Sequence, residues 1–395
     1  MRSVREADLA GKKVLLRVDF NVPLDEEGQI LDDTKIKAAL PTIRYILEQK
    51  AALILVSHLG RPQGGPQKNY SLKNVAAHLQ KLLGLTIKMA PDSIGEEVRE
   101  QASALTPGNI LMLENVRFHA EEERNDPQYS KQIAALGDIF INDAFGVAHR
   151  AHSSTSGIAD YLPVYAGFLL EKEVKVLGSV LKNPERPSMA IMGGAKIADK
   201  IGLIENIFEH MDYILIGGGM ANTFINAMGF EVGKSLCEKG LLGEAREIMK
   251  KARRRQVKIL LPSDVIVASE ISDRAAGLSV AIDKIPLESM IVDIGPDTIR
   301  DFSTAIMEAK TIIWNGPLGV YEYAQFAQGT KQIALAMAKS QAVTIIGGGD
   351  SAAAVQDLGL EKDITHISTG GGATIEFLEG LQLPGVVICQ ETKIS

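Results

Sequence analysis

Cysteine is scarce in this sequence, with two among 395 residues. Cys237 and Cys389 lie far apart and lack the spacing of a metal-binding pair, which fits a reducing compartment. The seven histidines do not pair at the spacing of a zinc site either, so we predict no zinc centre.

Long apolar runs and an excess of positive charge are also absent. No apolar run approaches the length of a membrane-spanning helix, and residues 1–8 lack the apolar region of a secretory signal. The net charge of −7 argues against general nucleic-acid binding, although local basic clusters can still bind a small anion. We therefore expect a cytoplasmic protein with no membrane and no nucleic-acid partner.

The length and the hydrophobic pattern predict two α/β domains. A chain of 395 residues is too long for one ordinary core. Short apolar runs, such as 53–56 and 139–141, alternate with segments of helical spacing in both halves. This alternation is typical of doubly wound parallel (Rossmann-like) sheets. We expect a first domain over 1–169, an interdomain segment over 170–184 whose helix runs to Asn183 and stops at Pro184, and a second domain over 185–377.

In the first half, basic side chains follow the predicted strands. Arg61, Arg117 and Arg150 come after three of them, with His58 and His149 nearby. The carboxyl ends of parallel strands share one edge of a sheet, where ligands of such folds bind. One such arginine is usually a solvated loop charge, but three at corresponding positions indicate an anion pocket, since guanidinium suits phosphate and carboxylate. The first half therefore predicts a site for a small phosphorylated acid.

In the second half, glycines follow the predicted strands instead. Triplets occupy 217–219, 347–349 and 370–372. Glycines let backbone amides approach a ligand closely, so repeated glycine turns predict a site for a nucleotide-sized polyanion. Asp350 follows one triplet, where it either caps a helix or supplies the single carboxylate that Mg²⁺ needs beside phosphates.

A further glycine pair precedes two lysines. The apolar run Met189–Met192 ends at Gly193-Gly194, and good helix formers follow. We predict a strand-to-helix turn that attracts phosphate, with Lys196 and Lys200 on one face of the helix. This arrangement indicates phosphoryl chemistry, and the alternative is a glycine-capped turn with two solvated lysines.

Two other functions remain to be weighed. Gly347-x-Gly349-x-x-Ala352 matches a dinucleotide fingerprint and would fit an NAD(P)-dependent dehydrogenase. The lysine pair and the arginine edge would then have no role in hydride transfer. A non-catalytic sugar-phosphate binding protein would not need the nucleotide half. Gly233-Lys234-Ser235 is not a P-loop, because residue 228 is methionine rather than glycine.

Several motifs together point to one family. They are R-V-D-F-N-V-P at 17–23, S-H-L-G-R-P at 57–62, L-E-N-V-R-F at 113–118, N-D-A-F-G-V-A-H-R-A-H-S-S at 142–154, G-G-A-K-I-A-D-K at 193–200, I-G-G-G-M-A at 216–221, W-N-G-P-L-G-V-Y-E at 314–322, G-G-G-D-S at 347–351 and S-T-G-G-G-A at 368–373. With these in order over nearly its whole length, the chain resembles phosphoglycerate kinases. The resemblance implies reversible phosphoryl transfer between 1,3-bisphosphoglycerate and Mg·ADP, giving 3-phosphoglycerate and ATP, in glycolysis and gluconeogenesis.

The resemblance also implies the roles of individual residues. The glycerate substrate would be bound by Asp19, Phe20, Asn21, Lys35, His58, Leu59, Gly60, Arg61, Arg117, His149 and Arg150. The nucleotide would be bound by Gly194, Ala195, Lys200, Gly218, Gly295, Asn315, Pro317, Glu322, Gly348, Gly349, Asp350 and Ser351. Catalysis would fall to Lys196, Lys35, Gly349 and Gly372, with Mg²⁺ on Asp350.

The family implies three further properties, and this chain departs from the family at one position. It implies a monomer, a hinge-bending motion that brings the two domains together, and a C-terminal segment (about 378–395) that packs on the first domain. At position 35, however, phosphoglycerate kinases usually carry an arginine, and this chain has lysine. Lys35 keeps the charge but loses the planar fork, so we expect an active enzyme.

Overall fold

The computed structural model describes residues 1–63 and 65–390. Contacts between residues divide the chain into two compact units. Unit 1 comprises residues 1–175 and the segment that starts at Gln382, and unit 2 comprises residues 176–381. The boundary falls inside helix α6 (Phe168–Lys182), whose sequence carries apolar residues at helical spacing.

Unit 1 contains a six-stranded parallel sheet in the order β3-β4-β2-β1-β5-β6. The strands are β1 (Lys13–Arg17), β2 (Ala52–Val56), β3 (Ile87–Met89), β4 (Ile110–Met112), β5 (Ile139–Asn142) and β6 (Val164–Ala166). The helices are α1 (Thr34–Glu48), α2 (Lys73–Leu83), α3 (Glu96–Ser103), α4 (Ala120–Glu123), α5 (Pro127–Ala134) and, near the C-terminus, α14 (Pro384–Val387). The parallel sheet predicted for the first half is confirmed.

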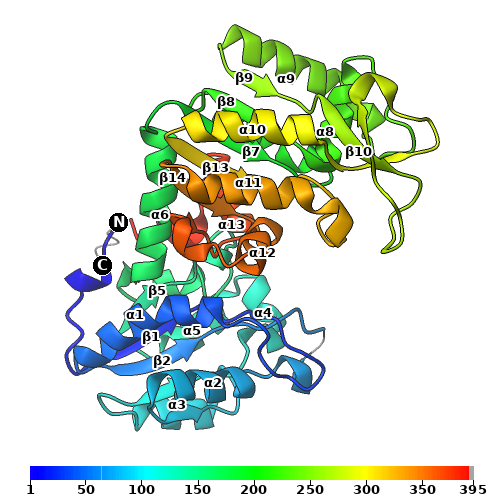
Figure 1. Ribbon diagram of the computed structural model, residues 1–395. Coiled ribbons are helices and arrows are strands. Elements are labelled where there is room, and N and C mark those ends of the chain that lie inside the picture. Colours follow the sequence, from blue (N-terminus) through cyan, green and yellow to red (C-terminus); the bar gives the residue numbers. More distant parts are fainter. Residues whose placement is uncertain (64, 391–395) are drawn as a thin grey trace. The chain divides into compact units, whose positions relative to one another are not determined.

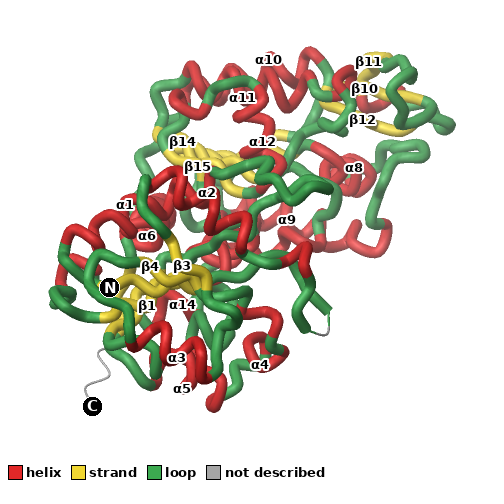
Figure 2. The backbone as a smooth tube through the Cα atoms, turned by 90° about the horizontal axis from the view of Figure 1, so that it is seen from below, coloured by secondary structure: helices red, strands yellow, loops and turns green. Residues whose placement is uncertain are grey.

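Both faces of this sheet are buried, as its nearly continuous apolar strands require. Val14 and Leu16 point to one face, where they join a core with Ile36 and Ile43 of α1 and Val75 of α2. Figure 2 shows α1 and α2 on one side of the strands and α3 and α5 on the other. The helices therefore cover the two faces and leave the carboxyl ends of the strands for loops.

The C-terminal segment of unit 1 lies beside β5 and β6. Asn142 Nδ2 donates to the Gly385 carbonyl at 2.9 Å, and the Arg2 amide donates to the Cys389 carbonyl at 2.8 Å. Arg2 in turn accepts from the Ala166 amide at 2.8 Å. Contacts far apart in sequence thus hold both ends of the described chain on the same sheet.

Unit 2 contains a second six-stranded parallel sheet, in the order β15-β14-β13-β7-β8-β9. The strands are β7 (Ser188–Met192), β8 (Tyr213–Ile216), β9 (Lys258–Leu260), β13 (Thr311–Asn315), β14 (Val343–Gly347) and β15 (His366–Ile367). The helices are α7 (Ile201–Ile207), α8 (Gly218–Ala227), α9 (Leu242–Arg254), α10 (Pro296–Glu308), α11 (Gln328–Lys339), α12 (Gly349–Asp357) and α13 (Gly372–Leu378). In Figure 1, α10 and α11 lie across one face of this sheet, over a core that includes Trp314, Phe302 and Ile333.

A small antiparallel sheet in unit 2 was not predicted from the sequence. Its order is β11-β10-β12, with β10 at Asp264–Ala268, β11 at Leu278–Ala281 and β12 at Met290–Ile294. The edge strand β11 is mostly exposed and lacks the alternation that marks a half-buried strand. The edge strand is therefore hard to predict from the sequence, whereas β10 and β12 contain short apolar runs of the kind that indicates strands.

Register brings the glycine turns of unit 2 together. Asn315 at the end of β13 pairs with Gly347 of β14 and with Met192 of β7, and Met192 pairs with Ile216 of β8. The turns that follow these four strands therefore start side by side at one edge. In unit 1, Arg17 at the end of β1 pairs with Val56 of β2 and Asn142 of β5. The loops that follow these three strands therefore also start side by side at one edge of the sheet.

The prediction of a helix directly after Gly193-Gly194 is wrong. Residues 193–197 form a loop, a short 3₁₀ turn spans Ala198–Lys200, and α7 begins at Ile201. Lys196 and Lys200 therefore do not share a helix face: Lys196 is exposed and Lys200 is buried. The loop is held by distant contacts, since Glu238 Oε2 accepts from the Ile197 amide at 2.6 Å.

Gly193 is required by the packing of two turns. A Cβ atom at this position would overlap the backbone of Pro317 and lie 2.6 Å from the Gly316 carbonyl oxygen. We expect Gly193→Ala to lower the free energy of unfolding by about 3 kcal/mol, because backbone atoms cannot rotate away from the added methyl group. Gly243→Ala in α9 is the control, since its Cβ meets nothing within 4 Å. Denaturant unfolding of both variants checks this, and equal midpoints would contradict the interlocked turns.

The described helices include none that is both long enough and apolar enough to cross a membrane.

Candidate active site

The loops after β1 and β2 carry the first group of predicted substrate residues. Lys35, in the first turn of α1, places its ammonium 2.8 Å from Asp19 Oδ2. Asn21 Oδ1 accepts from the Gly60 amide at 2.8 Å and so ties the loop after β1 to the loop after β2. Phe20 and Leu59 are buried and join the core, so their side chains fix these loops.

The predicted arginines are not equally placed. Arg117 donates to the Gly60 carbonyl at 2.8 Å and lies 3.3 Å from Glu123, and burial lowers its pKa to about 10. Arg150 donates from Nε to His149 Nε2 at 3.2 Å. Arg61 is exposed on the loop after β2. The structure thus gives Arg117 and Arg150 defined partners, whereas Arg61 extends into solvent.

A buried charged network that was not predicted from the sequence lies beneath these loops. Arg17, at the end of β1, is 1% exposed and donates to Ser154 Oγ at 2.9 Å. Ser154 donates to the fully buried carboxylate of Glu122 at 2.5 Å through its hydroxyl and at 2.9 Å through its amide. The sequence contains one indication of this network, since Arg17 lies within the apolar run 14–18. An arginine that is buried with such a strand needs a polar or charged partner.

His58 is held neutral by this network. Its Nδ1 lies 3.2 Å from Arg17 Nη2. Burial and the neighbouring charge of Arg17 hold the pKa of His58 well below its ordinary value. The ring therefore accepts a hydrogen bond from Arg17 and is a hydrogen-bonding group rather than a cation.

The glycine turns of unit 2 bond mainly to one another. The Gly194 amide donates to the Pro317 carbonyl at 2.8 Å, and the Gly316 amide donates to Ser351 Oγ at 2.7 Å. A Cβ at Gly218 would lie 2.8 Å from backbone atoms of Gly194 and Pro317. These glycines are thus needed for close packing of the turns, and their amides are only partly available to a ligand.

The starts of α12 and α13 do offer amides to a ligand. Gly349 is the first residue of α12 and Gly372 the first of α13, each preceded by a glycine with positive φ. The first amides of a helix have no partner within it. Gly349 is exposed, and a Cβ there would meet nothing within 4 Å, so a phosphate can approach this turn.

Lys200 is buried beside the end of β13. Its ammonium donates to the side-chain oxygen of Asn315, and it lies 3.3 Å from the Asn315 carbonyl oxygen. Burial lowers the pKa of Lys200 to about 8, and the negative charges of Asp199 and Asp350 offset this only in part. The ammonium is therefore charged at neutral pH but close to its titration range.

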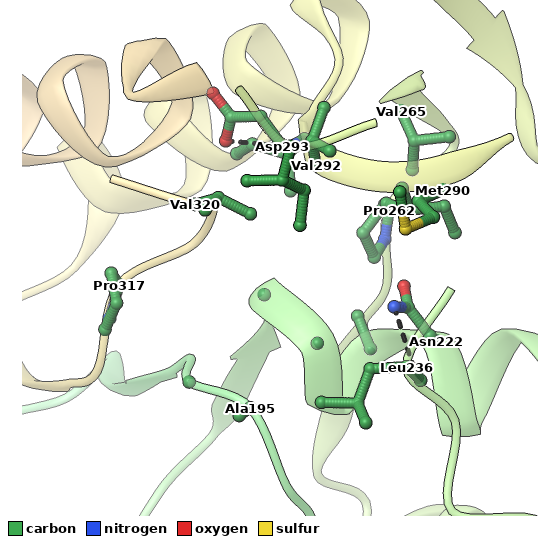
Figure 3. Close-up of a pocket in the computed structure, with 18 of the residues that line it drawn as sticks. Ala195, Asn222, Leu236, Pro262, Val265, Met290, Val292, Asp293, Pro317 and Val320 are labelled. Carbon is green, nitrogen blue, oxygen red and sulfur yellow. Dashed lines mark hydrogen bonds between the residues drawn. The ribbon is translucent and has the colours of Figure 1, made fainter. Parts of the chain in front are cut away.

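A cavity of about 520 Å³ opens next to these turns. Figure 3 shows Ala195 and Pro317 toward one end and Leu236, Met290 and Val265 toward the other. Six predicted nucleotide residues line it: Gly194, Ala195, Gly218, Pro317, Glu322 and Asp350. Its walls are mostly apolar, as expected for a site that binds a planar base.

The other predicted nucleotide residues lie outside the cavity lining. Lys200, Asn315, Gly348, Gly349 and Ser351 belong to the turns and helix starts at the strand edge. Gly295 precedes α10, and a Cβ there would overlap the Asp264 carboxylate, so the structure requires this glycine for packing.

Asp350, the predicted magnesium ligand, lies beside the cavity. It is an exposed residue in the first turn of α12, and it lines the cavity. Among residues 1–63 and 65–390, no cluster of three or more histidine, cysteine or acidic side chains could hold a metal alone. A single carboxylate beside a phosphate site fits Mg²⁺, which keeps several waters and takes further ligands from phosphates.

Comparisons with known proteins agree over nearly the full chain. Residues 4–381 match the family model described as phosphoglycerate kinase. The phosphoglycerate kinase of Pelotomaculum thermopropionicum is 52% identical over 385 residues, covering 98% of each chain. That of Dictyoglomus turgidum is 52% identical over 389 residues, covering 98% of each chain. The solved phosphoglycerate kinase of Coxiella burnetii superposes with a TM-score of 0.89 at 42% identity, covering 98% of each chain.

Proposed function

The chain belongs to the phosphoglycerate kinase family, and with this membership as the premise we propose which of its residues carry the reaction. The enzyme transfers a phosphoryl group reversibly between 1,3-bisphosphoglycerate and ADP, giving 3-phosphoglycerate and ATP. The match over residues 4–381 is the observation that carries this function. The two alternative functions, an NAD(P)-dependent dehydrogenase and a non-catalytic sugar-phosphate binding protein, do not agree with this match.

A coupled assay of ATP formation from 1,3-bisphosphoglycerate and ADP tests the activity directly. We expect the protein to form ATP when Mg²⁺ is present and to lose this activity when the metal is chelated. Calorimetric titration with Mg·ADP and with NADH is the second arm, and we expect heat only with Mg·ADP. Binding of NADH without phosphoryl transfer would contradict the assignment.

We propose that the loops of unit 1 bind the glycerate substrate. Lys35, Arg61, Arg117 and Arg150 supply positive charge for its phosphate and carboxylate groups. Neutral His58 and the side chains of Asp19 and Asn21 supply hydrogen bonds, and Phe20, Leu59 and Gly60 set the loop conformation. The ion pair of Lys35 with Asp19 and the bond of Arg117 to Gly60 support this proposal, because they hold these groups at one strand edge.

We propose that unit 2 binds the nucleotide. The apolar cavity takes the base and Glu322 the ribose, while Lys200 and the first turn of α12 meet the phosphates. Asp350 would hold Mg²⁺, which supplies charge neutralisation between the phosphates when bound. The support is that Glu322 and Asp350 both line the cavity that begins at the glycine turns.

Catalysis in this scheme needs alignment and charge rather than a base. In the ATP-consuming direction the nucleophile is the carboxylate of 3-phosphoglycerate, which is already ionised at neutral pH. We propose that Lys196 and the amides of Gly349 and Gly372 stabilise the charge on the transferred phosphoryl oxygens.

Because all proposed groups belong to one chain, we also propose a monomer. Two unpaired cysteines agree with our proposal of a cytoplasmic location.

Nucleotide affinity is expected to fall above about pH 8. The protonated form of Lys200 binds phosphate, and a bound phosphate raises its pKa above the value of about 8 in the free protein. Binding therefore takes up a proton, and Kd for ADP should rise by about tenfold per pH unit once Lys200 of the free protein deprotonates. Calorimetry between about pH 7 and 10 measures this, and Lys200→Arg should remove the dependence. A slope that persists in that variant would assign the effect to another group.

A further inference from the structure

Asn115 is a completely buried polar side chain near Arg117, in a turn of which only Arg117 has a proposed role. It lies three residues after the end of β4, and its exposed fraction is 0%. It is the N-cap of the short 3₁₀ turn Val116–Phe118, which carries Arg117. A buried amide destabilises the protein unless its polar atoms are hydrogen-bonded, so the partners of Asn115 show what it holds in place.

The side-chain amide of Asn115 bonds to the loop after β2, to the segment before α2 and to its own turn. Its Nδ2 donates to the Leu59 carbonyl at 2.7 Å and to the Tyr70 carbonyl at 2.9 Å. Its Oδ1 accepts from the Arg117 amide at 3.0 Å. Rotating the amide by half a turn would set Oδ1 against two carbonyl oxygens, so these contacts also fix its orientation.

One peptide group of the loop after β2 is held at both of its polar ends. Its oxygen is the Leu59 carbonyl, which accepts from Asn115. Its hydrogen belongs to the Gly60 amide, which donates to Asn21 Oδ1 at 2.8 Å. The next carbonyl along the chain, that of Gly60, accepts from Arg117 Nη1 at 2.8 Å. Rotation of this peptide group would therefore break the bonds to Asn115 and Asn21 and move the acceptor of Arg117.

The bond to Tyr70 holds a residue whose ring packs on the same loop. Gly60 has a φ of +62°, and a Cβ atom there would overlap the Tyr70 ring. Asn115 therefore fixes both the loop and the backbone of the residue whose ring covers it. The chain just after Tyr70 is fixed separately, since Glu114 accepts from Ser71 Oγ at 2.6 Å.

We propose that Asn115 is a positioning residue for the glycerate substrate, because it holds the loop that orients Arg117. This inference rests on the proposed glycerate site of unit 1. Asn115 is buried and acts through the peptide group between Leu59 and Gly60. A loop that already has its bound conformation loses less conformational entropy when the substrate binds, so preorganisation of this kind appears as affinity.

Steady-state kinetics of the full-length protein test the inference through Asn115→Asp. The substitution keeps the size of the side chain but removes at least one of its two donated hydrogen bonds. We expect KM for 3-phosphoglycerate to rise about tenfold, the scale of one buried hydrogen bond, while kcat stays nearly unchanged. A residue that only stabilises the fold would instead reduce the fraction of active protein, which lowers the apparent kcat and leaves KM unaltered. That result would overturn the inference.

Asn115→Ser is a second variant, for use if Asn115→Asp does not fold. Its hydroxyl keeps one donor and brings no charge into the buried site. Circular dichroism shows whether each variant is folded, and a folded variant should show the same rise in KM at nearly constant kcat. The KM for ADP should not change, because its proposed contacts lie in unit 2.

Ser71→Ala is the matched control. It removes the bond from Ser71 to Glu114 in the segment that contains Tyr70, and it leaves the bonds of Asn115 in place. We expect its KM for 3-phosphoglycerate to equal that of the unaltered protein. An equal rise in Ser71→Ala and Asn115→Asp would assign the effect to a general loosening of this segment and overturn the inference.

A double-mutant cycle with Arg117→Ala tests the route through Arg117. Once that side chain is absent, Asn115→Asp should raise KM for 3-phosphoglycerate by less than it does in the otherwise unaltered protein. Equal rises in the two backgrounds would overturn the inference. If Arg117→Ala alone left this KM unchanged, the proposed glycerate site itself would fail, and the inference with it.

Discussion

Lys196→Ala should lower kcat by roughly 10²–10³-fold, the scale of losing one preorganised electrostatic group. The affinity for ADP should change little, because the proposed contact forms with the transferring phosphoryl group. An interaction that strengthens only in the transition state appears in kcat rather than in binding. Steady-state kinetics in both directions, with calorimetry for ADP, measure the two effects separately.

The structure makes this expectation sharper than the sequence did. Lys196 is exposed on the loop 193–197 and follows two residues, Gly194 and Ala195, that line the nucleotide cavity. Glu238 anchors the loop just beyond Lys196, through the Ile197 amide. The backbone that carries Lys196 is thus held in place, while its exposed ammonium can move toward a phosphoryl group.

Lys239→Ala is the control for Lys196→Ala. Lys239 is also an exposed lysine, and it lies next to Glu238, which holds the loop. We expect this variant to keep kcat. A purified Lys196→Ala protein with nearly normal kcat would remove Lys196 from the mechanism, and equal losses in both variants would indicate a disturbed loop instead.

Several strands of the two parallel sheets could be predicted from the sequence because they depend on local pattern. Apolar runs such as 53–56 and 139–141 became β2 and β5, and the residues after them share one edge through strand register. The parallel topology follows from the alternation of strands with helices. The gathering of basic side chains in one unit and glycine turns in the other was therefore accessible from the sequence.

What escaped prediction depends on contacts between distant residues. The loop at 193–197 takes a non-helical path because Glu238 binds its backbone, 41 residues away. Arg17 is buried because Ser154 and Glu122 lie against it in the fold. Local composition near Met189–Lys200 favours a helix, and nothing in it reveals the distant carboxylate.

Lys35→Ala should also lower kcat severely, by roughly 10²–10³-fold. The resemblance places at this position a cation that contacts the substrate carboxylate and the migrating phosphoryl group. The structure supports such a role, because Lys35 points to Asp19 at 2.8 Å and its side chain is about one third exposed, at 31%. A solvated helix lysine would have no buried carboxylate to orient it.

The neighbouring lysine provides a matched control. Lys37 lies two residues further along α1 and pairs with Asp33 at 2.8 Å, and His78 contacts the same carboxylate at 3.0 Å. Residues two apart on a helix do not share a face. Lys37→Ala should therefore keep kcat, and a loss in this variant with none in Lys35→Ala would transfer the proposed role to Lys37.

The variant Lys35→Arg tests how much transition-state binding the natural lysine lacks relative to an arginine. An arginine can bind Asp19 with one edge of its fork and a substrate oxygen with another, whereas the lysine ammonium acts as a single point charge. The missing second hydrogen bond should cost on the order of 1–3 kcal/mol of transition-state binding at most. We therefore expect Lys35→Arg to retain or raise kcat/KM for 3-phosphoglycerate. A marked loss would show that the pocket around Asp19 has adapted to the smaller ammonium, so that its charge alone carries the interaction.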